Sequence, residues 1–278
     1  MKRLLIVGYG DIARRTAPLL ASRFDLRVAS RSSGVDLDRP ESLASLECAD
    51  AVLHCAPPPQ TGETDTRTAN LLAALETQRI LPTRFVYIGT SGVYGDCAGA
   101  LVDESRSLNP QSARAIRRVH AEELLALWCM RHRISLLVLR APGIYAADRL
   151  PLARLRAGTP ALCDTDDVYT NHIHADDLAG ICARCLEDDA PPGAYNASDD
   201  TQLKLGAWLD LVADRSGLPR PPRVAKSEAA GRIPPDLLTF MSESRRLDNR
   251  RLKRILVARL RYPTVYEGLA HEHPVGVD

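Results

Sequence analysis

Short, continuous apolar runs alternate with helical segments along the first half of this chain. The first run is Arg3–Val7, and similar runs follow at residues 26–30, 51–55, 84–89 and 135–140. Helical patterns lie between them, most clearly at residues 63–76 and 112–132. Strands that are apolar at successive positions are buried on both faces, which is typical of parallel strands. The alternation therefore predicts a parallel sheet with helices on both faces.

The predicted fold class is α/β, a Rossmann-type doubly wound parallel sheet, because crossovers between parallel strands are right-handed. Beyond residue 145 the rhythm weakens, prolines become frequent and the predicted strands shorten. We therefore expect residues 1–145 to form the Rossmann core. Residues 146–278 are expected to form mostly a smaller, discontinuous C-terminal lobe, with some segments returning to the core.

Charge and hydropathy argue against several classes of protein. The formal net charge is +1 and the isoelectric point is about 7.6. A nucleic-acid or membrane-surface binder usually carries a marked basic excess, so neither partner is expected. The N-terminal sequence enters a strand at once, and no apolar run approaches the length of a membrane span. These features predict a cytoplasmic protein.

Two local patterns allow both a structural and a functional interpretation. Cys182 and Cys185 form a C-x-x-C within a predicted helix and have no second ligand pair, so we interpret them as core residues rather than a metal or redox site. No metal site is predicted elsewhere. Residues 245–261 are basic with spaced leucines, which predicts an amphipathic helix with a solvated arginine face. A surface for an acidic partner is the alternative.

A glycine-rich turn directly follows the first strand. Residues 8–13, Gly-Tyr-Gly-Asp-Ile-Ala, fit the dinucleotide-binding pattern G-x-G-x-x-G/A. Gly8 would allow the tight turn, Gly10 would let the backbone approach a pyrophosphate, and Ala13 would let the helix pack closely. The helix N-terminus would add N–H donors and positive partial charge. An ordinary strand-to-helix turn is the alternative. The predicted cofactor residues here are Gly8, Gly10, Asp11, Ile12 and Ala13.

The end of the second strand informs the choice between the two nicotinamide cofactors. A site that prefers NAD normally has an acidic residue there for the ribose hydroxyls. This strand ends instead in Ser30-Arg31-Ser32, with no carboxylate. Arg31 and the hydroxyls of Ser30 or Ser32 could hold a 2′-phosphate, so NADP(H) is favoured over NAD(H). The alternative is that Arg31 stacks on adenine or faces solvent.

Several further motifs follow in order, and with them the chain resembles the extended, sugar-nucleotide epimerase-like branch of the short-chain dehydrogenase/reductase superfamily. Residues 34–37 are similar to the family's G-D-L segment, although this part of the chain is short, and residues 50–56 to D-x-V-x-H-x-A. Residues 89–95 resemble the hydroxyl-bearing segment that ends in V-Y-G. Residues 140–145 resemble the loop that closes over the nicotinamide, and residues 173–179 resemble I-H-x-D-D-L-A.

The resemblance implies roles for residues in these segments. It places the catalytic hydroxyl on Thr90, with Ser91 as its neighbour, and it assigns the C-terminal lobe to a small-molecule substrate. It also implies cofactor contacts by Asp36, Leu37, Cys55, Ala56, Pro57, Pro142, Gly143 and Ile144.

The chain departs from the family at the catalytic pair. The family pattern is Y-x-x-x-K, in which the phenol is the acid/base and the lysine lowers its pKa and binds the nicotinamide ribose. Aligned on Ala121-Glu122, these positions hold Arg114 and Arg118. Arg118 can still bind the ribose, but a guanidinium does not titrate near neutral pH. The chain is similar here to the atypical subgroup with arginine in place of the Tyr–Lys pair.

A catalytic acid would then have to come from elsewhere. Tyr94 is assigned to the catalytic set, with Thr90, Ser91 and Arg118, because the tyrosine of V-Y-G usually lines the cleft. Arg149 and Arg154 follow the closing loop and could grip a phosphate or carboxylate, with solvation as the alternative. The other candidates for the acid are Tyr145, Tyr169, His120, His172 and His174. The predicted substrate-binding residues are Tyr145, Arg149, Tyr169 and His174.

Two functions of different class remain open at this point. The first is an NAD(P)-dependent oxidoreductase or epimerase-like enzyme that transfers a hydride to or from a carbon bearing a hydroxyl or carbonyl. The second is a catalytically silent NADP(H)-binding sensor or interaction protein. A homodimer through residues 63–76 and 112–132 is expected by analogy with the family.

Overall fold

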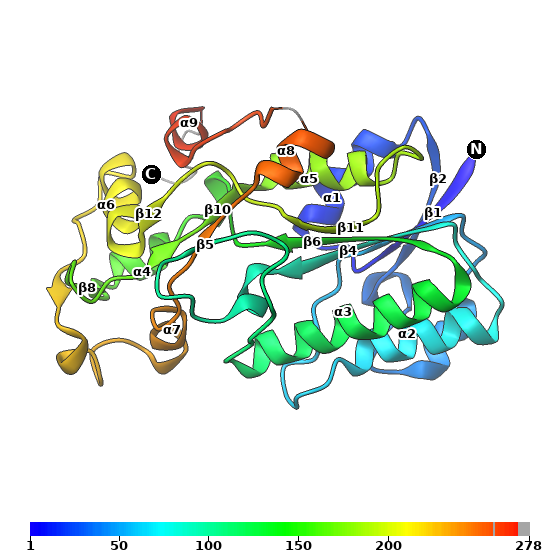
Figure 1. The fold of residues 1–278 in the computed structure, drawn as a ribbon, viewed down its shortest axis with the longest axis horizontal. Coiled ribbons are helices and arrows are strands. Elements are labelled where there is room, and N and C mark those ends of the chain that lie inside the picture. Colours follow the sequence, from blue (N-terminus) through cyan, green and yellow to red (C-terminus); the bar gives the residue numbers. More distant parts are fainter. Residues whose placement is uncertain (258, 272–278) are drawn as a thin grey trace.

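A computed structural model describes residues 1–257 and 259–271 of the chain. Its centre is a parallel sheet of six strands in the order β11-β6-β4-β3-β1-β2 (Figure 1), which confirms the predicted fold class. From one edge to the other, the strands are β11 (Gly193–Asn196), β6 (Ser135–Ala141), β4 (Arg84–Thr90), β3 (Ala51–His54), β1 (Lys2–Val7) and β2 (Phe24–Ala29).

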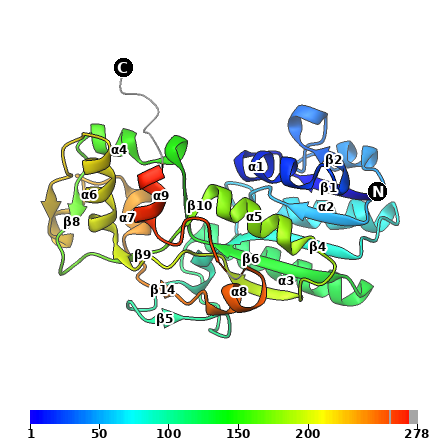
Figure 2. The ribbon, with the colours of Figure 1, turned by 90° about the horizontal axis from the view of Figure 1, so that it is seen from above.

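Helices cover both faces of this sheet (Figures 1 and 2). One layer contains α2 (Thr66–Thr77) and α3 (Ala113–His132), and the other contains α1 (Asp11–Leu20), α5 (Ala175–Cys185) and α8 (Arg250–Ile255). Successive strand residues point to opposite faces. Leu4 and Ile6 of β1 therefore join the core under α1 and α5, whereas Leu5 and Val7 join the core under α2 and α3.

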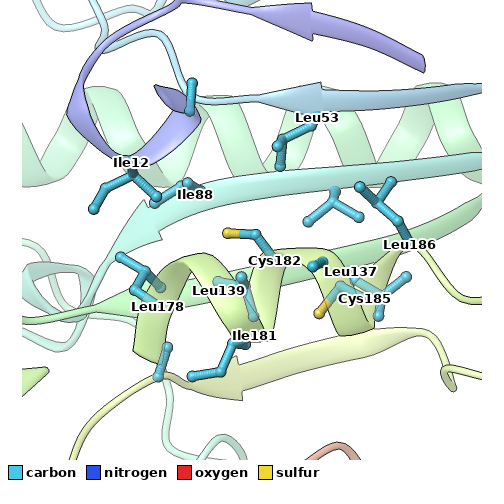
Figure 3. Close-up of a cluster of buried hydrophobic side chains, with 14 of the residues drawn as sticks. Ile12, Leu53, Ile88, Leu137, Leu139, Leu178, Ile181, Cys182, Cys185 and Leu186 are labelled. Atoms are coloured by element: carbon cyan, nitrogen blue, oxygen red, sulfur yellow. The ribbon is translucent and has the colours of Figure 1, made fainter. Parts of the chain in front are cut away.

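The core between the sheet and α5 contains the C-x-x-C pair (Figure 3). Cys182 and Cys185 are fully buried, with free thiols. Burial raises the pKa of Cys185 to about 12 and that of Cys182 well above its ordinary value. Both thiols stay protonated at neutral pH and pack as small apolar groups. Their interpretation as core residues is confirmed.

A smaller lobe lies beyond the carboxyl ends of the sheet strands and is built from short strand pairs and helices (Figure 2). Its helices are α4 (Leu152–Arg156), α6 (Leu205–Arg215), α7 (Pro235–Phe240) and α9 (Val265–His271). The paired strands are β7 (Gly143–Tyr145) with β10 (His172–His174), β9 (Tyr169–Thr170) with β12 (Leu203–Lys204), β8 (Ala161–Leu162) with β13 (Arg223–Val224), and β5 (Leu101–Val102) with β14 (Arg246–Leu247).

Segments from the second half of the chain return to the core. Strand β11 adds to the sheet beside β6, and α5 packs against α1. The boundary at residue 145 stays a prediction. Short 3-10 helices complete the described chain: η1 (Arg31–Ser33), η2 (Pro40–Ser45), η3 (Ser91–Tyr94), η4 (Ala147–Arg149) and η5 (Lys226–Glu228).

Two segments, residues 30–50 and 245–261, affect the edges of the sheet and of the lobe. Between β2 and β3 the described chain forms η1 and η2 and no strand, so β2 is an edge strand. The single helix predicted for residues 245–261 is wrong. Its first part pairs with β5, where Arg246 N donates to Ala100 O and Asp248 N to Val102 O. Pairing with another segment overrides local helical periodicity there.

A buried carboxyl group joins β11 to the lobe. Asp199 is 4% exposed. Its Oδ1 accepts from Thr201 N at 2.9 Å, while its Oδ2 has no hydrogen-bond partner within the described residues. Burial raises the pKa of Asp199 to about 8 in spite of the bond from Thr201. The folded protein therefore holds this group protonated at pH values where the unfolded chain ionises it.

This shift predicts a pH-dependent gain in stability for Asp199→Asn. Below pH 4 both folded and unfolded chains carry the protonated acid, and between about pH 4 and 8 the wild type loses stability as pH rises. The variant lacks this loss, so its advantage should grow from pH 5 to pH 8 in urea unfolding. Asp164→Asn, at an exposed carboxylate, is the control. An Asp199→Asn difference that is constant with pH would contradict the shift.

Candidate functional site

Four loops meet at the carboxyl-terminal edge of the sheet. Because the strands are parallel, the turn after β1, the loop after β3, and the ends of β4 and β6 lie along one edge. Ligands of open α/β sheets bind at this edge. Most residues predicted from the sequence to bind a cofactor or substrate belong to these loops.

The glycine-rich turn after β1 is held against the loop after β3. Gly8 has φ +83° and its N–H donates to Ala29 O at 2.8 Å. A Cβ at Gly8 would lie 2.6 Å from Ala56 N, closer than packing allows. At Gly10 a Cβ would meet nothing within 4 Å, so space beside the N-terminus of α1 is open. Ala13 is fully buried beneath the turn. This arrangement fits a dinucleotide pyrophosphate.

The loop after β3 is fixed by the same turn. The N–H groups of Cys55 and Ala56 both donate to Val7 O, at 2.8 and 3.0 Å. Pro57 is exposed, and its carbonyl accepts from Arg67 Nη1 at 3.1 Å. The predicted cofactor residues of this loop therefore lie directly beside the glycine-rich turn.

Asp11 and Ile12, the other two predicted residues of the turn, have different surroundings. Ile12 is buried in the core. The carboxylate of Asp11 accepts from Arg15 Nε at 2.9 Å and from Arg149 Nη1 at 2.8 Å. Burial raises the pKa of Asp11, but these hydrogen bonds outweigh it and the pKa is lowered overall. The guanidinium of Arg149, predicted to bind substrate, is thus held at the turn, and its role toward a substrate stays a prediction.

The end of β2 exposes the groups predicted to choose between cofactors. Ser30 Oγ lies 2.9 Å from Ser32 Oγ, and both Arg31 and Ser32 are exposed. The side chain of Arg31 makes no hydrogen bond or ion pair with any described residue, so its guanidinium is available to a ligand. Asp36 Oδ1 accepts from Asp38 N at 3.0 Å, which shapes the following turn. Leu37 is buried, so it supports this turn from below.

A cavity of about 630 Å³ opens between the ends of β4 and β6 and the smaller lobe. It brings together five residues predicted from the sequence: Thr90, Ser91, Pro142, Gly143 and Tyr169. Arg154, predicted to grip an anion, also lines it. Ile144 is half-buried and packs on the core instead. Sequence reasoning missed the lining residues from the late lobe, which include Asn171, Leu237, Phe240, Glu243 and Arg245.

The hydroxyl-bearing segment lies at the floor of this cavity. Thr90 is the last residue of β4 and the N-cap of η3, and its Oγ1 accepts from Gly92 N at 3.2 Å. Ser91 is buried but reaches the cavity wall. Thr90 Oγ1 still has an O–H to donate, so it can orient a ligand carbonyl or hydroxyl.

One face of α3 carries the residues that replace the catalytic pair. Arg114, Arg118 and Glu122 recur every fourth residue and therefore share that face. Arg118 Nη1 donates to Tyr87 OH at 3.0 Å and to Ile88 O at 2.9 Å, which ties α3 to β4. Arg114 lies one turn earlier and lines the cavity, with its guanidinium 4.3 Å above the ring of Phe240.

The tyrosine of V-Y-G is absent from the cavity wall. Tyr94 is 1% exposed, its hydroxyl donates to Asn196 Oδ1 at 2.8 Å, and it accepts from Arg140 Nη1 at 2.9 Å. Burial raises the pKa of Tyr94 to about 12. The phenol of Tyr94 is therefore part of a polar network beneath the site, and its catalytic role stays a prediction.

Tyr145 and His174, both predicted to bind substrate, are buried and lie outside the cavity wall. Tyr145 is 2% exposed, packs on Trp208 and donates to Thr264 O at 3.3 Å. His174 is fully buried as the N-cap of α5, where its Nδ1 accepts from Asp176 N at 3.1 Å.

The other two histidine candidates also fill structural positions. His172 is buried against Trp208, and burial lowers its pKa to about 3. His120 Nδ1 accepts from Asp65 N at 3.0 Å. Neither imidazole belongs to the cavity wall.

The described residues contain neither a membrane-spanning helix nor a cluster of metal-binding side chains. Among residues 1–257 and 259–271, no helix is long and apolar enough to cross a membrane. Within the same ranges, no group of three or more histidine, cysteine, aspartate or glutamate side chains could hold a metal ion. The cytoplasmic location stays a prediction.

The buried network under the cavity predicts a large loss of stability when one charge is removed. Arg140 and Glu122 are each 7% exposed, and Arg140 Nη2 donates to Glu122 Oε2 at 2.8 Å. Glu122→Gln leaves the guanidinium uncompensated, so the free energy of unfolding should fall by about 3–5 kcal/mol in urea denaturation. The double variant Glu122→Leu/Arg140→Met should recover most of this loss. Glu41→Gln, in an exposed pair, should change little; equal losses in both single variants would contradict the role of burial.

Comparison with known proteins identifies the family. The model of the NAD dependent epimerase/dehydratase family matches residues 14–198. None of the curated proteins compared matches the sequence. Among solved structures, a conserved protein of unknown function from Silicibacter pomeroyi is 28% identical, with 97% of each chain covered and a TM-score of 0.80.

More distant structures share the fold. RMD from Pseudomonas aeruginosa, solved with NADPH, is 21% identical, with 97% of each chain covered and a TM-score of 0.74. The UDP-glucose 4-epimerase of Thermotoga maritima, solved with UDP-glucose, is 17% identical, with 96% of each chain covered and a TM-score of 0.74. With the family model matching about two thirds of its length and a nucleotide-binding edge of the expected geometry, the chain belongs to the NAD-dependent epimerase/dehydratase family.

Proposed function

We propose that this protein is an NADP(H)-dependent oxidoreductase or epimerase-like enzyme acting on a small molecule that bears a hydroxyl or carbonyl group. The observation that carries the proposal is that the predicted pyrophosphate site and the cavity lie along one edge of the sheet. The open turn at Gly10 and the cavity at Thr90 lie on the same sheet edge. A dinucleotide with its pyrophosphate at the turn would extend its nicotinamide toward Thr90. Hydride transfer depends chiefly on such positioning.

The preference for NADP(H) rests on the end of β2. Arg31 is exposed, and its guanidinium has no hydrogen-bond or ion-pair partner among the described residues. Its neighbours in the sequence, Ser30 and Ser32, provide two hydroxyls. A guanidinium and hydroxyls are suited to a 2′-phosphate. Solved structures of similar fold include complexes with either cofactor: RMD with NADPH and the UDP-glucuronic acid 4-epimerase of Bacillus cereus with NAD.

This preference predicts that Arg31→Ala selectively weakens NADPH binding. Loss of a charge-assisted contact should raise the Kd for NADPH by about 10- to 100-fold and leave the Kd for NADH nearly unchanged. Calorimetry on both cofactors measures the two values. Arg39→Ala removes another exposed arginine near this end of the sheet and is the matched control. Equal losses for both cofactors in Arg31→Ala would contradict the assignment.

Tyr169 is proposed as the proton donor. It is the one among our tyrosine candidates that lines the cavity, since Tyr94 and Tyr145 are buried elsewhere. Its backbone is fixed by a bond from Tyr169 N to Ser244 Oγ at 3.1 Å, and Arg246 lies over its ring. Arg114 and Arg118 cannot replace a titrating phenol, because guanidinium groups keep their proton near neutral pH.

A catalytically silent NADP(H)-binding protein is the second candidate. The specific observation in its favour is that both catalytic-pair positions hold guanidinium groups, while Tyr94 is held in the buried network. As an interaction protein it would use a homodimer surface on α2 and α3, where Leu127 and Met130 are 62% and 73% exposed. We propose this dimer for either function.

Titration of the purified protein with NADPH and NADH tests both candidates at their common step. Both predict tight NADPH binding, and the enzyme additionally predicts NADPH oxidation in a screen of carbonyl compounds. In that case Tyr169→Phe should lower kcat by about 100-fold or more, as expected for removal of a general acid. A folded protein that binds neither cofactor would overturn both candidates. Binding without turnover across the screen would favour the silent protein.

A further inference from the structure

Arg114 is a cation in the cavity wall that has no hydrogen-bond or ion-pair partner in the described part of the chain. It occupies the face of α3 that points to Thr90 and Ser91, and all three residues line the same cavity. Its side chain is solvent-accessible. Other arginines near the sheet edge and the cavity have carboxylate partners: Arg140 pairs with Glu122, Arg149 with Asp11 and Arg245 with Glu243. The unpaired state of Arg114 within a cavity therefore calls for a ligand.

Stacking fixes the direction in which this cation presents its donors. The guanidinium carbon lies 4.3 Å from the centroid of the Phe240 ring, at the end of α7. A guanidinium held against an aromatic face keeps its five N–H groups free at its edge. That edge matches the two oxygens of a carboxylate or phosphate. The ring of Phe240 lines the cavity and is 51% exposed, so the stacked guanidinium lies where a ligand can reach it.

The cavity wall holds two further arginines, and two carboxylates, Asp236 and Glu243, also line it. The arginines are Arg154 and Arg245, and the buried Nε atom of each has no hydrogen-bond partner in the described chain. Glu243 is paired with Arg245 at 2.8 Å and forms no ion pair with Arg114. Burial, together with Arg118, Arg245 and Arg117, lowers the pKa of the Arg114 guanidinium in spite of the opposing charge of Glu243. A bound anion would relieve this repulsion among cations.

We propose that the substrate of this site is an anion whose carboxylate or phosphate group binds bidentately to the Arg114 guanidinium, beside the hydroxyl or carbonyl held at Thr90. The contact between the substrate and Thr90 rests on the proposed function. The inference gives Arg114 a role in substrate binding, at the position where the resemblance places the catalytic acid of the family. Arg154 adds a second cation without an ion pair among the described residues to the same cavity wall.

The test is calorimetric binding of malonate and of inorganic phosphate to the full chain, with and without NADPH. Wild-type protein should bind at least one of them, and the preferred probe distinguishes a carboxylate from a phosphate substrate. Arg114→Gln should weaken this binding at least 10-fold. Arg114→Lys should retain part of it, because an ammonium keeps the charge and loses the fork. Phe240→Leu should weaken it a few-fold, since the stacking surface is lost.

Arg156→Gln is the matched control, because Arg156 is an exposed arginine of α4 outside the cavity wall. It should bind the probe like the wild type. Failure of the wild type to bind either probe, or unchanged binding in Arg114→Gln, would overturn the proposal. Because Arg114 is exposed, its variants should fold, which an unchanged urea midpoint verifies. NADPH binding is read separately, so loss of the anion site and loss of the dinucleotide site are distinguishable.

Discussion

The buried ion pair between Arg140 and Glu122 is the interaction on which the rest of the site depends. Removing two charges from water is costly, and each would be far more costly alone, so the pair must form whenever the chain folds. Arg140 belongs to β6 and Glu122 to α3, and the pair therefore fixes the rotation of α3 on the sheet. Tyr94 and Asn196 extend the network to η3 and β11.

That network decides which groups reach the cavity. The hydroxyl of Tyr94 forms hydrogen bonds within the network, whereas Thr90 and Ser91 line the cavity. With α3 fixed by Glu122, the residue two turns earlier, Arg114, faces the cavity. The protein thus shares the framework of its family. At the position where the resemblance places the family's phenol, it carries the permanent cation Arg114.

A permanent cation cannot move a proton, but it can bind and orient an anion. The dinucleotide edge and the cationic cavity are therefore compatible with hydride transfer, provided another group such as Tyr169 supplies the proton. If no group does, the same geometry describes a protein that binds cofactor and anion together without turnover. The two functions share their binding steps and differ in a single proton transfer.

The sequence by itself determined the parallel sheet, the glycine turn at Gly8 and the hydroxyl at Thr90, because these follow from local patterns: continuous apolar strands, a backbone close approach and a short motif. Tertiary structure decided the rest. The distant strand β5 made the segment after residue 245 pair as a strand instead of forming one helix. Tyr94 is buried in the polar network, and burial of a single side chain cannot be read from a local sequence pattern. Arg149 lies at the glycine-rich turn because its guanidinium forms an ion pair with Asp11. The cavity wall could not be predicted, since α7 and Arg245 approach α3 only in the folded chain.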